Sequence, residues 1–123
     1  MVTSPTPAEM ERYIATARKR KQAEQQQKEQ RQQQGWQIAS QAAALLKEHF
    51  HVQRVWLFGS MVTLHRIHPN SDIDLAVQGL NPAQYLAAVT ELLDVSEFSI
   101  DVVQIEYAQP SLRETIAQQG LEL

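Results

Sequence analysis

Residues 55–60 read Val-Trp-Leu-Phe-Gly-Ser, and after a spacer of eleven residues, residues 72–75 read Asp-Ile-Asp-Leu. The first segment predicts a buried strand that ends at Gly59-Ser60, because the apolar run stops there and glycine favours a turn. The second segment begins a half-buried strand, because apolar residues alternate with acidic or small ones from Asp72 to Val77. These two strands form the centre of the predicted fold.

The Gly59-Ser60 turn has a composition suited to binding an anion. Gly59 lets the backbone approach a charged ligand closely, because it has no side chain in the way. Backbone N–H groups and the Ser60 hydroxyl can then donate hydrogen bonds to phosphate oxygens, especially where the next residues begin a helix. Gly-Ser pairs also occur in ordinary turns, so this prediction depends on the carboxylates that follow.

Three acidic residues are predicted to lie beside this turn. Asp72 and Asp74 are two residues apart on a strand, so both side chains leave the same face. Asp101 lies in the apolar segment 100–105, which predicts a third strand; if that strand is adjacent, three carboxylates converge. Like charges at that distance repel unless cations neutralise them, and oxygen ligands suit Mg²⁺. The pattern favours two-metal phosphoryl or nucleotidyl transfer, with Asp101 as a metal ligand that helps to deprotonate the attacking hydroxyl. The alternative is a solvated sheet face.

Helices are predicted around these strands. An amphipathic helix ends near His49, and Asn81 with Pro82 opens a second helix. A capping box at residues 111–114 begins a last helix that ends near Gln119. The inward residues expected for the second helix are Tyr85, Leu86, Val89, Leu92 and Leu93. The order α-β-β-α-β-α predicts an α+β fold of two layers, with a small mixed sheet and helices on one face.

The N-terminal third differs in composition from the rest. Residues 1–35 hold seven Lys/Arg and four Glu (net +3), whereas residues 36–123 hold four Lys/Arg and ten Asp/Glu (net −6). The first seven residues, with two prolines, predict a frayed tail. A short apolar stripe follows, and then eight of the thirteen residues from 22 to 34 are glutamine. This composition predicts a Gln-rich basic helical arm over 1–35, partly disordered and exposed or bound to a partner, joined at Gly35 to a domain over 36–123. The stripe consists of Met10, Tyr13, Ile14 and Ala17.

Composition excludes several classes of protein. The chain has no cysteine, which excludes disulfide scaffolds, thiol nucleophiles and cysteine-ligated metals. It has no apolar stretch long enough for a membrane span and no secretory signal, so a cytoplasmic protein is expected. The net charge of −3 argues against general binding of nucleic acid. His65-x-x-His68 has the spacing of zinc ligands, but no further ligands complete the set. Ser60 lacks the sequence context of a serine nucleophile.

Phe58-Gly59-Ser60 followed by Ser71-Asp72-Ile73-Asp74-Leu75 resembles the signature of the DNA polymerase β-type nucleotidyltransferase superfamily, and specifically of its minimal nucleotidyltransferase (MNT) members. The resemblance covers residues 36–123. It implies that Gly59 and Ser60 hold the triphosphate of ATP, that Asp72 and Asp74 bind two Mg²⁺ ions, and that Asp101 is the third carboxylate.

Two features depart from the family pattern. The spacer is eleven residues rather than about ten, and Met61 stands where many relatives carry a basic residue. Arg66, with His65 or His68, is a candidate for the missing phosphate contact.

The MNT resemblance also implies a biological role. Similar MNT proteins pair with HEPN ribonuclease toxins and act as antitoxins by transferring AMP from ATP to a tyrosine of the toxin. The expected function is therefore a Mg²⁺-dependent protein adenylyltransferase with a HEPN-type toxin as partner. One alternative is a non-catalytic antitoxin that occludes its partner with the arm, and another is transfer to a small hydroxylated molecule such as an aminoglycoside. RNA binding by residues 18–21 is a further possible use of the arm.

Overall fold

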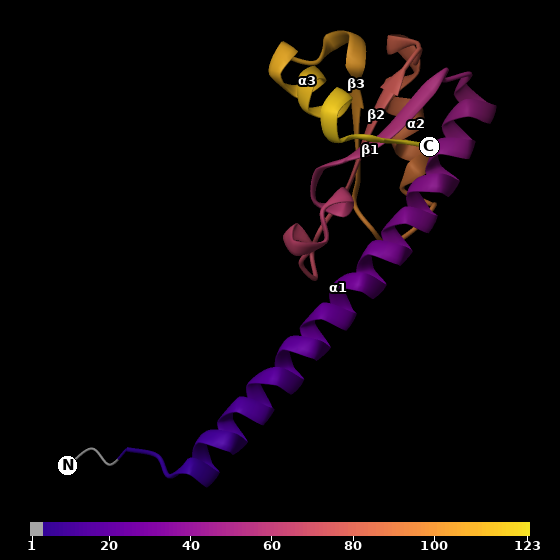
Figure 1. The fold of residues 1–123 in the computed structure, drawn as a ribbon. Helices are drawn as coiled ribbons and strands as arrows, with labels where there is room; N and C mark the ends of the chain where they lie inside the picture. Colours follow the sequence, from indigo (N-terminus) through magenta and orange to yellow (C-terminus); the bar gives the residue numbers. More distant parts are fainter. Residues whose placement is uncertain (1–3) are drawn as a thin grey trace.

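The chain consists of one very long helix and a four-stranded sheet that packs against its C-terminal part (Figure 1). The computed structural model describes residues 4–123, so part of the tail expected for residues 1–7 lies outside the described residues. Helix α1 runs from Pro7 to Phe50, a length of 44 residues, or about 66 Å at 1.5 Å per residue. Its N-terminal part extends away from the rest of the molecule.

The sheet is mixed and has the strand order β3-β2-β1-β4. Strand β1 is antiparallel to both β2 and β4, whereas β2 and β3 are parallel. The strands are β1 (Arg54–Phe58), β2 (Ile73–Gln78), β3 (Ile100–Gln104) and β4 (Leu121–Glu122). Helix α2 (Tyr85–Leu92) connects the parallel pair, and α3 (Pro110–Gln119) follows β3. This architecture confirms the α+β fold with a small mixed sheet; β4 was not predicted.

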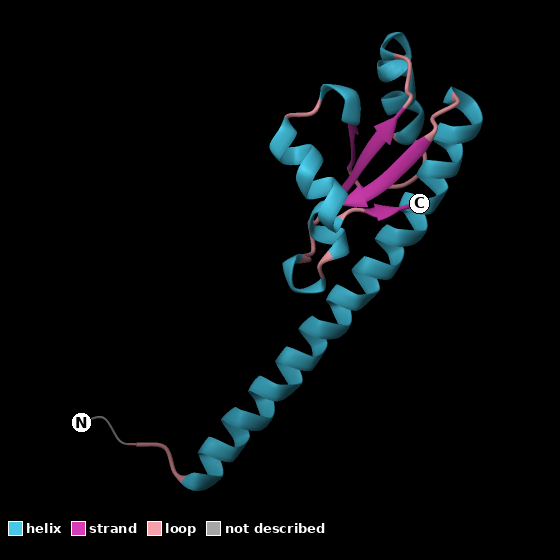
Figure 2. Cartoon of the chain, turned by 45° about the horizontal axis from the view of Figure 1, so that its top comes forward, coloured by secondary structure: helices cyan, strands magenta, loops and turns pink. Residues whose placement is uncertain are grey.

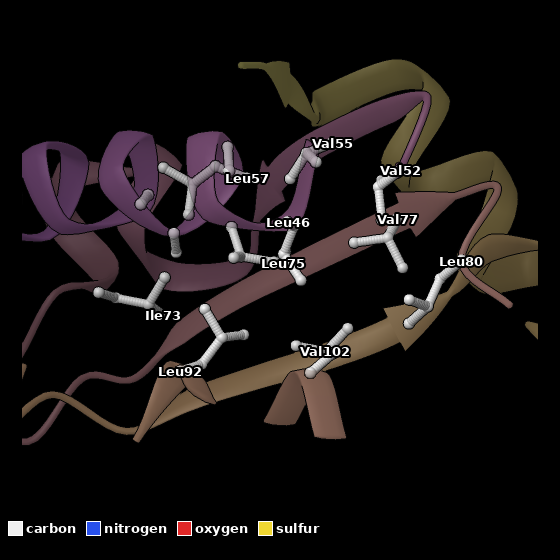
Figure 3. Packing of buried hydrophobic residues seen from close by; sticks show 14 of the residues in the cluster. Leu46, Val52, Val55, Leu57, Ile73, Leu75, Val77, Leu80, Leu92 and Val102 are labelled. Carbon is white, nitrogen blue, oxygen red and sulfur yellow. The ribbon is translucent and has the colours of Figure 1, made fainter. Parts of the chain in front are cut away.

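The main hydrophobic core lies between the sheet and the helices α1 and α2 (Figure 3). Leu57 and Leu75 from the two central strands are completely buried, and so is Leu46 from α1. Val102 of β3 and Leu92 of α2 close the cluster beside them. Because side chains alternate along a strand, the acidic positions of β2 and β3 lie on the opposite face from this core.

Helix α3 lies across the sheet from α1 (Figures 1 and 2). Its buried residue Ile116 is not part of the main cluster. The expectation of helices on one face therefore holds for α1 and α2, while α3 partly covers the other side.

Gly35 does not interrupt α1, contrary to the predicted boundary at this residue. The helix continues through it, and Gly35 is buried against Met61, which has no exposed surface. A Cβ atom at position 35 would lie 2.6 Å from the sulfur of Met61. The glycine is thus a packing position, because the absence of a side chain lets Met61 approach the helix, rather than a helix breaker.

Two leucines of the second predicted helix are wrongly assigned to the core. Leu86 is 77% exposed and Leu93 is 73% exposed. Asn81 does accept a hydrogen bond from the backbone N–H of Ala83 as predicted, but it caps a 3-10 turn, and α2 begins only at Tyr85. The delayed start rotates the buried stripe onto Ala88 and Leu92.

The capping box predicted at residues 111–114 is also wrong. Helix α3 starts one residue earlier, with Pro110 at its first turn after Gln109, and no side chain caps it. A capping box does exist elsewhere, at the start of α1, where the Thr6 side chain accepts from the Glu9 N–H. Within residues 4–123, no helix is both long enough and apolar enough to span a membrane.

Candidate functional site

Two of the predicted site carboxylates are direct neighbours in the sheet. Asp74 of β2 is paired with Asp101 of β3 in the parallel register. Residues opposite each other on adjacent strands point to the same face, so both carboxylates lie on the side away from the main core. The antiparallel register of β1 and β2 places Asp74 opposite Phe58, the residue just before the Gly-Ser turn.

Gly59 lies directly against Asp74. The backbone of Gly59 has φ +78°, in the left-handed region that residues with a side chain rarely adopt. A Cβ atom here would collide with the Oδ2 atom of Asp74. The following residues, Gly59–Val62, form a single 3-10 turn, and both Gly59 and Ser60 are half-buried. The bend therefore remains partly accessible beside the carboxylates.

A tight turn positions Asp72 at the start of β2. Ser71 is 1% exposed, and its hydroxyl accepts a hydrogen bond of 2.8 Å from the His68 N–H. The Ser71 N–H donates in return to the carbonyl of His68, at 2.9 Å. This closed turn delivers the chain into the strand, so that Asp72 is exposed on the same face as Asp74.

The electrostatics of the cluster show that the three carboxylates act on one another. Burial, as the largest cause, together with the charges of Asp101 and Asp72, raises the pKa of Asp74 to about 6. A hydrogen bond between the carboxyl groups of Asp74 and Asp101 acts in the same direction, whereas the charge of Arg66 opposes the rise. The structure thus brings together all three carboxylates that the sequence singled out.

This raised pKa predicts that folding depends on pH through Asp74. An unfolded aspartate has a pKa of about 3.9, so between about pH 4 and pH 6 the folded chain holds a proton that the unfolded chain releases. The unfolding free energy contributed by Asp74 therefore falls as the pH rises through this interval. Asp74→Asn removes the charge. We expect the free energy of unfolding of this variant to exceed that of the wild type by about 1–2 kcal/mol at pH 7.5, allowing for solvent screening.

Urea unfolding at pH 4 and pH 7.5 measures this difference. The gap between Asp74→Asn and wild type should nearly vanish at pH 4, where Asp74 is neutral in the folded chain. Asp94→Asn is the matched control, because Asp94 is an exposed carboxylate in the turn after α2. A gap of equal size at both pH values would contradict the assignment of the effect to Asp74.

The donor set suits a hard divalent cation. Carboxylate oxygens are the ligands that Mg²⁺ takes from proteins, and a cation would offset the repulsion that raises the pKa of Asp74. Within residues 4–123, no three His, Asp or Glu side chains already stand in the geometry of a formed metal site. The carboxylates are neighbours on one face without a closed coordination shell, an open arrangement in which substrate phosphates would complete the ligand set.

The two departures from the family pattern have structural counterparts. Met61 fills the contact with Gly35 and is completely buried, so its position serves the core rather than the site. Arg66, in the 3-10 turn Leu64–Arg66, is exposed yet close enough to lower the pKa of Asp74. The cation absent at position 61 is thus present five residues later.

Contacts from α1 to the site loop were not predicted. Arg31 donates from Nη2 to the carbonyl of Ser71, the residue before Asp72, at 3.0 Å, and its guanidinium lies 3.7 Å from the centre of the Phe98 ring. Gln32 and Trp36 both donate to the carbonyl of Met61. The helical spacing of these residues is the signal that could have revealed them, since Gln32, Trp36 and the buried Ala39 share one face.

Known proteins share this fold and sequence pattern. Residues 40–123 match the family described as polymerase beta, nucleotidyltransferase. No curated protein sequence matches at a significant level. Among solved structures, a toxin–antitoxin complex with AMP-PNP contains a chain that is 28% identical, with a TM-score of 0.56; the match covers 64% of this chain and 66% of that one.

Two more distant structures show the same fold. One is the complex of a tri-AMPylated Shewanella oneidensis HEPN toxin with its MNT antitoxin, at 22% identity and TM-score 0.55, covering 72% of this chain and 70% of that one. The other is a minimal nucleotidyltransferase, at 19% identity and TM-score 0.50, covering 81% of this chain and 96% of that one.

Proposed function

The chain belongs to the polymerase beta nucleotidyltransferase family, and on that premise we propose that it is an antitoxin-type enzyme that transfers AMP from ATP to a hydroxyl of a HEPN-type toxin. The proposed acceptor is a tyrosine. Support for this role comes from the toxin–antitoxin complexes that share its fold, one of them with AMP-PNP and one with an AMPylated toxin.

The observation that carries the proposal is the position of Asp74. It pairs with Asp101 across β2 and β3, and the glycine of the Gly-Ser turn lies directly against its carboxylate. A nucleotidyl-transfer site needs ligands for cations and hydrogen-bond donors for phosphate oxygens within one nucleotide's length of each other. The carboxylates and the Gly-Ser turn would supply these two sets of groups.

Each residue of the site has a role in the proposal. Asp72, Asp74 and Asp101 would hold Mg²⁺ through their oxygens, and the bound cations would supply charge stabilisation to the phosphoryl group being transferred. Backbone N–H groups at Gly59 and Ser60, with the Ser60 hydroxyl, would orient the triphosphate. Asp101, which is exposed on β3, would accept the proton of the attacking hydroxyl.

The free part of α1 is proposed to dock the acceptor protein. Tyr13 is 69% exposed and Ile14 46% exposed. Residues 18 apart lie on the same helix face, since five turns contain 18 residues. Tyr13 and Ile14 therefore share the face of Arg31 and Gln32, which contact the site loop, and lie about 27 Å further along. A small folded protein resting against the site loop would meet this apolar stripe.

Label transfer tests the proposed reaction. The purified chain is incubated with Mg²⁺, ATP labelled at the α-phosphate, and a purified HEPN-type toxin. We expect label to become attached to that protein in a form stable to denaturation, and mass spectrometry to place it on a tyrosine. Absence of transferred label from the wild-type reaction would overturn the proposal.

The same assay separates docking from chemistry. Tyr13→Asp is expected to raise the acceptor concentration needed for half-maximal rate about tenfold, because a charge at a buried interface position is costly, while the rate at saturation is kept. Ala15→Asp is the matched control, because Ala15 is exposed and lies two positions, or about 200°, around α1 from Tyr13. Equal effects of the two variants would remove the arm from the docking model.

A further inference from the structure

A groove of about 850 Å³ lies between α1 and the loop that precedes β2. Its α1 side is formed by residues 24–34, which lie outside the part of the chain that matches the nucleotidyltransferase family. Its loop side is formed by residues 65–69. None of the five predicted site residues lines it. The groove therefore lies between the arm and this loop, outside the carboxylate cluster, and Arg66, which lowers the pKa of Asp74, borders both.

The groove is positively charged in an otherwise acidic protein. Lys28, Arg31 and Arg66 line it, and Glu24 is its single acidic lining residue. Within residues 4–123, none of the three cations takes part in a salt bridge. Three uncompensated cations around one concavity attract an anion, and more strongly because the walls exclude part of the solvent.

Arg31 is held in place but not neutralised. Its Nη2 bond to the Ser71 carbonyl and its stacking on Phe98 fix the guanidinium. Among residues 4–123, its Nε is a buried side-chain nitrogen without a hydrogen-bond partner. A partly buried guanidinium without an acidic partner is costly, and an anion beside it would offset that cost.

The remaining lining residues match the other parts of a nucleotide. Gln27, Gln30 and Gln34 offer amide donors and acceptors along one wall, suited to sugar hydroxyls and base edges. His65 and His68 add flat rings on the other wall. The volume lies within the range of about 300–1,000 Å³ that is typical of small-molecule sites.

We propose that this groove binds a phosphate-bearing ligand of nucleotide size, without Mg²⁺ and separately from the carboxylate cluster. The phosphate lies among Lys28, Arg31 and Arg66. The shared chemistry is a phosphate ester, whose source is either a free nucleotide or an RNA strand. The site goes beyond the proposed transfer reaction and does not require it.

Binding measured in EDTA tests this site with three probes: tripolyphosphate, ATP and a hexanucleotide of RNA. Titration calorimetry of the full chain should show binding that weakens as salt is raised. Lys28→Gln and Arg66→Gln should each weaken it about tenfold, and Lys19→Gln, which removes an exposed cation of α1 outside the groove, should not. ATP binding that is markedly tighter than tripolyphosphate binding identifies a free nucleotide as the source; a markedly tighter hexanucleotide identifies an RNA strand.

Three results would overturn the proposal. They are the absence of binding by all three probes, unchanged affinity in Lys28→Gln, which alters the groove but not the carboxylate site, and an equal loss in Lys19→Gln. Thermal unfolding of each variant checks that the fold is retained. Asp72→Asn should keep this metal-independent binding, so a failure of AMP transfer and a failure of the groove are told apart in the same set of proteins.

Discussion

Asp72→Asn is expected to lower AMP transfer about 10³-fold while the fold remains intact. Asp72 is exposed at the start of β2, so its replacement by an amide of the same size disturbs no packing. The substitution removes one negative charge from a set whose proposed purpose is to hold cations, and an amide oxygen is a far weaker ligand for Mg²⁺ than a carboxylate. The measurement is the initial rate of label transfer from ATP to the acceptor protein.

The control for this prediction is Asp94→Asn, which removes the same charge from an exposed position in the turn after α2. It should keep the wild-type rate, showing that net charge is not the cause. Circular dichroism of both variants establishes that the fold is retained. If Asp72→Asn keeps more than about a tenth of the wild-type rate, Asp72 is not a cation ligand of the reaction.

Gly59→Ala is expected to damage both stability and activity. At φ +78° a side chain costs about 1–2 kcal/mol of unfolding free energy. In addition, the new methyl group would collide with the carboxylate of Asp74, so either the turn or the carboxylate must move. Because positioning errors of about 1 Å can cost about 10²-fold in rate, we expect label transfer to fall by about that factor.

Gly79→Ala provides the matched comparison. Gly79 also has a positive φ, +87°, but it follows the C-terminal end of β2, and its added Cβ would meet the exposed side chain of Gln53 rather than a carboxylate. Its loss of stability in urea should resemble that of Gly59→Ala, while its rate of label transfer should stay near wild type. Similar rates for the two variants would mean that Gly59 contributes only backbone conformation.

The central strands and the acidic pattern were predictable because they are local. The apolar run, the turn and the alternation of residues over 52–77 each report a backbone conformation that is set within a few neighbouring residues. The proximity of Asp101 to Asp74 can be predicted from the sequence only if β3 lies beside β2, since strand order depends on how β3 returns past α2. The observed parallel pairing meets that condition.

The errors occurred where packing outweighed local preference. Leu86 and Leu93 follow a helical pattern, yet the 3-10 turn before α2 rotates them into solvent. Glycine often ends a helix, yet Gly35 lies inside α1, where Met61 packs against it. The second outcome cannot be read from neighbouring residues, because it depends on Met61, which is distant in the chain; the first depends on where α2 begins, which the sequence pattern placed too early.

Sequence alone determined three of the four strands, the Gly-Ser turn, the three carboxylates and the charge difference between the arm and the rest, since each follows from residue type and short-range periodicity. Tertiary structure alone decided which partners these residues meet. It placed Asp74 between Gly59 and Asp101, carried Arg31 from the arm to the loop before Asp72, and formed the cationic groove. The physical reason is that these contacts join residues up to 40 positions apart, and their free energy arises only when the sheet and α1 are assembled.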